Sequence, residues 1–103
     1  MTERPEIVCL CGSARFADAL AAVRRELTLA GSIVLAPELV DDASGEPLSG
    51  EQRAALGVLH LRRIDLADRV LVVDPGGYVG ESTAREIAYA RAAGKPVAFT
   101  EPA

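Results

Sequence analysis

The fold is decided by one long stretch, RVLVVDPGGYVGESTAREIAYARAAGKPVAFT, residues 69–100. Its apolar start, residues 69–74, predicts a buried strand, and a glycine-rich loop follows. A helix is expected from residue 82 or 83 to residue 93, because Gly94 suits the left-handed conformation that commonly ends a helix. A second apolar run, residues 96–100, predicts another strand. This order of strand, helix and strand predicts two parallel strands joined by a right-handed crossover.

Two similar units precede this stretch. The apolar run Ile7–Cys11 predicts a strand that ends in a Gly-Ser turn. The apolar residues that then recur at helical spacing are Phe16, Leu20, Val23 and Leu27. Residues 32–36 predict a second strand, and residues 51–66 predict a second helix. Between them, residues 37–50 are rich in Pro, Gly, Ser and Asp, which predicts a long loop that is either a lid over a ligand or a surface insertion.

The predicted elements alternate between strand and helix along the whole chain of 103 residues. Half of the residues are apolar and only 4% are aromatic, which suits aliphatic helices packed on a parallel sheet. We therefore predict a single domain, residues 1–103, with the α/β fold of a flavodoxin-like or Rossmann-like three-layer sandwich. Its parallel sheet is expected to have about four strands, in the order 2-1-3-4. The ligand of such a sheet lies where the strand order reverses, between the loops after the first and third strands.

The net charge of −4 argues against a nucleic-acid partner, because proteins that bind phosphate backbones usually carry a basic face. No apolar run reaches the roughly 18 to 20 residues that span a bilayer. The first residues also lack the pattern of a signal peptide. A cytoplasmic protein without membrane contact is therefore expected.

Cys9 and Cys11 are the only cysteines, and a single residue separates them in a predicted strand. Alternate side chains of a strand point to the same face, and this spacing is too short for an unstrained disulfide bond. Without further cysteines or clustered histidines, the pair does not match a zinc motif. We expect two buried core thiols, no metal site and no cofactor.

The turn after the first strand has the residues of an anion site. Gly12 and Ser13 present backbone N–H groups and a hydroxyl at the start of a helix, and Arg15 adds a bidentate donor. The turn matches neither the P-loop pattern nor the dinucleotide-binding pattern. The alternative is that Ser13 is an ordinary helix N-cap and Arg15 is a solvated side chain.

The loop after the third strand offers a second group of candidates. Gly80 allows the backbone to approach a ligand closely, and Ser82 lies at the start of a helix. Tyr78 either lies over a base or sugar or covers the core. Asp74 either binds a ribose hydroxyl or initiates the turn before Pro75.

Glu86 lies three residues after Thr83, so the segment TARE fits the capping box S/T-x-x-E. In that motif the Glu side chain accepts a hydrogen bond from the N-cap N–H. Spacing alone favours this interpretation of Glu86 over a catalytic one.

Three segments of the chain carry a resemblance to a known family: CGSAR, IDLADRVLVVD and GESTAREIAYARAAGKPV. Over roughly residues 7–100 the chain resembles the nucleoside 2-deoxyribosyltransferase-like superfamily, including its small 2'-deoxynucleoside 5'-phosphate N-hydrolases. The resemblance implies that Glu86 is a nucleophile that attacks the anomeric carbon and forms a glycosyl-enzyme intermediate. It also implies that Gly12, Ser13 and Arg15 hold a 5'-phosphate.

Two positions depart from that family's pattern. His60 stands where the family has a second carboxylate, and it is either an acid or base near neutral pH or a polar helix residue. Gly80 stands where the transferases have an Asp.

The expected function is an N-glycosidase or deoxyribosyltransferase-like enzyme acting on a nucleoside or nucleoside 5'-monophosphate. The alternative is a non-catalytic nucleotide-binding module of the same fold. A homodimer or larger homo-oligomer is expected because so short a chain cannot bury all of its apolar surface alone.

Overall fold

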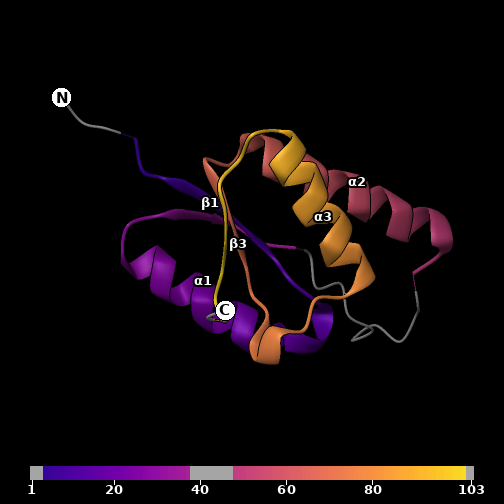
Figure 1. Cartoon of the computed structure of the whole chain (residues 1–103), viewed down its shortest axis with the longest axis horizontal. Helices are drawn as coiled ribbons and strands as arrows, with labels where there is room; N and C mark the ends of the chain where they lie inside the picture. The colour runs from indigo at the N-terminus through magenta and orange to yellow at the C-terminus, as the bar shows by residue number, and fades with distance from the viewer. Residues whose placement is uncertain (1–3, 38–47, 102–103) are drawn as a thin grey trace.

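Strands and helices alternate along the chain as the sequence predicts (Figure 1). A computed structural model describes residues 4–37 and 48–101. The strands are β1 (Ile7–Cys11), β2 (Ile33–Leu35), β3 (Arg69–Val72) and β4 (Val97–Phe99), and the α-helices are α1 (Ala17–Leu29), α2 (Gly50–Leu66) and α3 (Glu81–Ala92). Short 3-10 helices, η1 (Ala14–Phe16) and η3 (Pro75–Gly77), follow β1 and β3. Most of the loop predicted at residues 37–50 lies outside the described residues, so its role as a lid stays a prediction.

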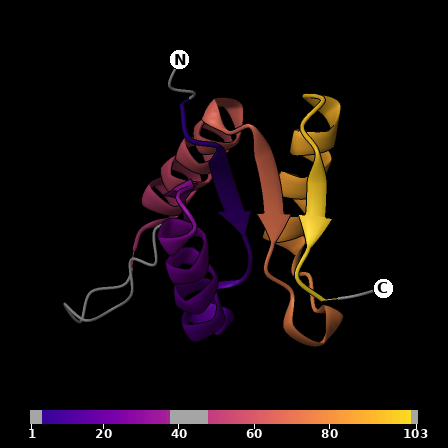
Figure 2. The same ribbon diagram turned by 90° about the vertical axis from the view of Figure 1, so that its left-hand side faces the viewer.

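The described strands form one parallel sheet in the order β2-β1-β3-β4, which confirms the predicted fold class. In β1, Val8 pairs with Val34 of β2 on one side and with Arg69 of β3 on the other. The arrows of β1, β3 and β4 point the same way in Figure 2. β1 and β3 are neighbours although α1, β2 and α2 separate them in sequence. The strand order therefore reverses between β1 and β3, where a ligand site is expected.

The sheet lies between two layers of helices (Figure 1). Val8 and Leu10 of β1 pack with residues of α1, whereas Cys9 and Cys11 pack with residues of α2 and α3. All four side chains are fully buried. A strand that is covered on both faces favours an apolar residue at every position, which explains the continuous apolar run in β1. Each large aliphatic side chain buried in this way contributes about 1.5–3 kcal/mol.

The start of α3 differs from the sequence prediction. The N-cap is Gly80, with no side-chain cap, and the helix begins at Glu81. Thr83 therefore lies inside the helix and is buried, and the capping box expected between Thr83 and Glu86 is wrong. The motif requires its Ser or Thr at the N-cap, outside the helix, whereas here the core takes up the Thr83 side chain. Glu86 lies in the second turn of α3 and does not cap the helix.

A close contact joins the loops that follow β1 and β3. The backbone N–H of Val73 donates to the carbonyl of Cys11 at 2.8 Å. A Cβ atom added to Gly12 would lie only 2.9 Å from the carbonyl oxygen of Val73, so this position requires glycine. Gly76 and Gly77 have φ values of 66° and 80°, which turn the second loop back toward α3. These two loops form the end of the sheet at which the candidate site lies.

Candidate functional site

A pocket of about 430 Å³ lies at the carboxyl ends of β1 and β3. Of the residues predicted from the sequence, those that line it are Gly12, Ser13, His60, Tyr78, Gly80, Ser82 and Glu86. They come from the loops after β1 and β3, from α2 and from α3. The structure thus brings seven of the nine predicted site residues to one pocket at the reversal of strand order.

A larger hollow of about 660 Å³ lies along α1 and β2. It is lined mostly by aliphatic side chains and by arginines, and no carboxylate is among its lining residues in the described part of the chain. We place the candidate site in the smaller pocket because the acidic and hydroxyl groups that can do chemistry are gathered there.

Arg15 and Asp74 are the two predicted residues that do not line the pocket. The guanidinium carbon of Arg15 lies 4.2 Å from the centroid of the Tyr78 ring, so Arg15 stacks on a wall of the pocket. The Asp74 carboxylate accepts hydrogen bonds from the Thr100 hydroxyl at 3.2 Å and from the backbone N–H of Glu101 at 3.0 Å. Asp74 therefore ties the end of β3 to the segment after β4, away from the pocket.

Glu86 combines partial burial with an accessible pocket. Its side chain is half-buried, and burial raises the pKa of its carboxyl. The charge of His60 and the Cys11 thiol act in the opposite direction without offsetting that effect. The carboxylate therefore has neighbouring groups that stabilise its charge and an open side toward the pocket.

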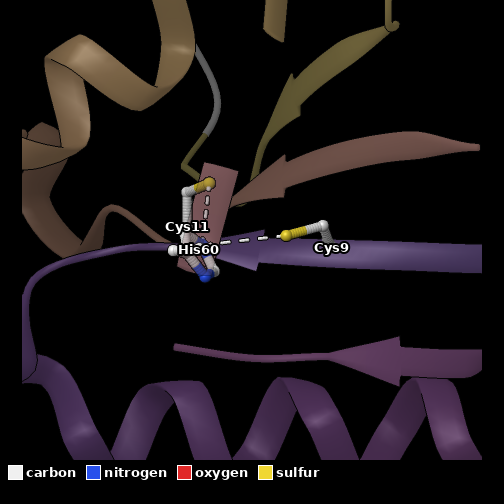
Figure 3. A group of neighbouring side chains, drawn as sticks. All are labelled: Cys9, Cys11 and His60. Atoms are coloured by element: carbon white, nitrogen blue, oxygen red, sulfur yellow. Dashed lines mark hydrogen bonds between the residues drawn. The ribbon is translucent and has the colours of Figure 1, made fainter. Parts of the chain in front are cut away.

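His60 is buried between the helix layer and β1, with 2% of its surface exposed. Its Nε2 atom lies 3.5 Å from the Sγ atom of Cys11 and 3.7 Å from that of Cys9 (Figure 3). Its Nδ1 atom lies 3.4 Å from Nη1 of Arg63. Burial lowers the pKa of His60, but the hydrogen bond and charge of Cys9, together with the charge of Glu86, raise it overall. His60 thus contacts the core thiols with one nitrogen and a cation with the other.

The two cysteines are free and buried, as expected from the sequence. They also influence each other, because the hydrogen bond between them lowers the pKa of Cys9 and raises that of Cys11. The sequence did not indicate that His60 joins them. The two sulfur atoms and one imidazole nitrogen lie within 4.8 Å of one another, a set of donors that can hold a metal ion.

Sequence reasoning missed Arg53 and Arg63, which also line the pocket. Both lie on α2, seven residues before and three residues after His60. Residues at these spacings share one face of a helix, and this periodicity is the signal that identifies them. α2 therefore brings two cations to a pocket whose acidic groups come from α3.

Comparison of the chain with protein-family models and with curated proteins finds no match. Among residues 4–37 and 48–101, no helix combines the length and the apolar character needed to cross a bilayer. The resemblance to the deoxyribosyltransferase-like superfamily therefore stays a prediction from the sequence.

Proposed function

We propose that this protein is an N-glycosidase or deoxyribosyltransferase-like enzyme that cleaves the N-glycosidic bond of a nucleoside or nucleoside 5'-monophosphate. The observation that carries the proposal is the position of Glu86. It is a half-buried carboxylate in a pocket at the reversal of strand order, and it does not cap its helix. A carboxylate in such a position can act as a nucleophile toward an anomeric carbon.

In the proposed reaction, an oxygen of Glu86 bonds to the anomeric carbon as the bond from that carbon to the base nitrogen breaks. The base leaves with the bonding electrons and takes up a proton. We assign this proton to His60, because it lines the pocket and the pKa of its ring is raised. Water then attacks the anomeric carbon and gives one proton back to His60, which frees Glu86 and releases the sugar. In a transferase a second base takes the place of water.

The remaining pocket residues position the substrate in this proposal. Ser13 and the backbone around Gly12 face the ligand near a helix start, where an anionic 5'-phosphate is favoured. Arg15 adds a cation beside the ring of Tyr78, which supplies a flat surface for a base or sugar. Gly80 lies beside this ring and lets it pack closely, because an added Cβ would lie 3.4 Å from the Tyr78 hydroxyl.

A non-catalytic nucleotide-binding module is the second candidate, and the contacts of His60 favour it. Its Nε2 atom faces the two thiols, and its Nδ1 atom faces Arg63. An imidazole held in this way must give up one of these contacts before it can protonate a departing base. The module would bind the same ligands without releasing a base.

We extend the proposal to a homodimer or larger homo-oligomer in the cytoplasm. α2 exposes Val58, Leu59 and Leu66, with exposed fractions of 57%, 46% and 67%. Large apolar side chains on one helix are typical of surfaces that pack against another subunit.

The test is release of free base from a panel of nucleosides and nucleoside 5'-monophosphates, measured by chromatography. We expect release by the wild type and its loss in Glu86→Ala and Glu86→Gln. Glu81→Gln is the matched control, because Glu81 also lines the pocket but its side chain is 91% exposed and pairs with Arg85. It should retain activity.

Folding of each variant is checked by circular dichroism. Absence of release from every substrate, together with a nucleotide that raises the melting temperature, would reject the enzyme and leave the binding module. Activity that survives Glu86→Ala would reject Glu86 as the nucleophile.

A further inference from the structure

Three potential metal ligands meet in the core beside the candidate site. Cys9 and Cys11 come from the central strand β1, and His60 comes from the middle of α2 (Figure 3). Their Sγ and Nε2 atoms lie within 4.8 Å of one another. All three side chains are buried on regular elements, so their relative positions are fixed by the sheet and by the packing of α2 on it.

The spacing of these atoms matches that of ligands around one zinc ion. Zinc bonds to thiolate sulfur at about 2.3 Å and to imidazole nitrogen at about 2.0–2.1 Å, usually in a tetrahedral arrangement. Tetrahedral angles then place sulfur and nitrogen about 3.6 Å apart. The observed separations are 3.5 Å from Cys11 and 3.7 Å from Cys9. Both separations are therefore compatible with ligands that share one zinc ion.

The charges and the path of entry also suit a thiophilic divalent cation. Two thiolates offset the charge of the ion in a buried place, and a neutral imidazole adds none. Water can supply the fourth donor from the adjoining pocket, as in zinc sites that have three protein ligands. His60 and Glu86 both line the pocket, which provides a route for the ion. With Nε2 on the metal, Nδ1 carries the ring hydrogen, so the contact of 3.4 Å between Nδ1 and Nη1 of Arg63 must open when the ion binds.

We propose that Cys9, Cys11 and His60 form a zinc-binding site beside the pocket. This site does not depend on the proposed glycosidase function. If that function holds, zinc occupies His60, the proposed proton donor, and the zinc-loaded protein releases no base. Zinc then acts as an inhibitor that removes the catalytic acid.

The test is a titration of the untagged, chelator-treated chain with Co²⁺ as a spectroscopic probe, followed by displacement with Zn²⁺. We expect a thiolate-to-cobalt charge-transfer band that saturates at one equivalent and disappears as zinc is added. We expect zinc affinity to fall by more than about 100-fold in each of Cys9→Ala, Cys11→Ala and His60→Ala. Even the loss of a residue that only hydrogen-bonds to a metal ligand lowers metal affinity by about 10–100-fold. Val70→Ala, in the same core cluster, removes no ligand and should leave the zinc affinity nearly unchanged.

Absence of the band, or a band that persists in folded Cys11→Ala, would overturn the proposal. Zinc-edge X-ray absorption of the wild type needs no substitution, so it decides the question even if the variants do not fold. It should show two sulfur ligands, and a shell of nitrogen and oxygen alone would reject the site. The glycosidase proposal is tested separately, by measuring base release by the metal-free protein. Absence of release there would reject the glycosidase and not the zinc site.

Discussion

The Nε2 atom of His60 lies 3.5 Å from the Sγ atom of Cys11, although 49 residues separate the two in sequence. This contact joins α2 to the central strand at the floor of the candidate site. A buried imidazole with partners on both nitrogens contributes packing as well as hydrogen bonds. His60 is therefore important for folding whatever its part in function.

We expect His60→Ala to lower the free energy of unfolding of the metal-free protein by about 2–4 kcal/mol, since it leaves a cavity and removes a partner of the buried thiols. Urea denaturation followed by circular dichroism measures the change. Arg62→Ala on the same helix is the control, because its ion pair with Asp65 is exposed and should contribute less than about 1 kcal/mol. If the free energy of unfolding fell equally in His60→Ala and Arg62→Ala, a structural role for His60 would be contradicted.

Glu86→Gln should raise the melting temperature of the metal-free protein at neutral pH. Burial raises the pKa of Glu86 in the folded state, so its ionised form is less favourable there than in the unfolded chain. That cost is present at neutral pH and disappears as the pH falls through the raised pKa. A neutral amide of similar shape removes it. A stabilised but inactive variant is the pattern expected of a functional residue.

Thermal unfolding of the wild type and Glu86→Gln at several pH values measures this difference. The gap between their melting temperatures should narrow as the pH is lowered, because the wild-type carboxyl then becomes neutral as well. A lower melting temperature for Glu86→Gln at neutral pH would show that the ionised carboxylate stabilises the fold.

Asp68 should make the stability of the protein fall steeply in acid. Its carboxylate accepts hydrogen bonds from Arg4 at 2.9 and 2.6 Å and from the backbone N–H of Ile7 at 2.8 Å. The Arg4 hydrogen bond is the main cause that lowers the pKa of Asp68 from 3.8 to about 2. Because the folded-state pKa is lowered, this stabilisation is complete above the ordinary pKa and is lost as the pH falls toward about 2.

Asp68→Asn is expected to lower the urea midpoint at neutral pH and to flatten its decline between about pH 4 and pH 2. Asp18→Asn removes the same charge from the first turn of α1 and serves as the control. The urea midpoint at neutral pH should fall by less in this control than in Asp68→Asn. If the urea midpoint of Asp68→Asn changed with pH as it does in the wild type, the acid sensitivity could not be assigned to this carboxylate.

Gly12→Ala should destabilise the protein by about 1–3 kcal/mol, the usual cost of an added methyl group in a tight place. The new Cβ would lie 2.9 Å from the Val73 carbonyl oxygen, so the loop must move away from the end of β3. Gly57→Ala is a matched control, because nothing lies within 4 Å of its added Cβ and alanine favours the helix by roughly 0.5–1 kcal/mol. Urea denaturation should show a lower free energy of unfolding for Gly12→Ala and a higher one for Gly57→Ala.

The sheet and its order could be predicted because they depend on apolar runs and on the handedness of crossovers. The predicted bounds of β1 agree with the structure, and those of α2 differ by one residue. The start of α3 could not be read from TARE, because the pattern does not say whether Thr83 lies outside the helix or in the core. Spatial clustering of the site followed from the same rule of topology, since the loops after β1 and β3 meet wherever the strand order reverses.

The inward face of α2 was harder to predict. Leu59 is apolar, yet 46% of it is exposed, whereas the neighbouring His60 is buried. The burial of an imidazole depends on partners elsewhere in the chain, here the two thiols of β1, and local sequence does not contain that information. Arg53 lies on the same face of α2 as His60 and also lines the pocket.

The positions of Arg15 and Arg53 lead to a prediction about phosphate recognition. Arg15 contacts a wall of the pocket through the Tyr78 ring, and Arg53 lines the pocket itself. If Arg15 holds the 5'-phosphate, Arg15→Ala should weaken binding of a nucleoside 5'-monophosphate by at least about tenfold, the equivalent of one charge-assisted hydrogen bond. Binding of the matching nucleoside, which has no phosphate, should hardly change. Isothermal titration of both ligands measures the two affinities, and a selective loss in Arg53→Ala alone would transfer the role from the loop after β1 to α2.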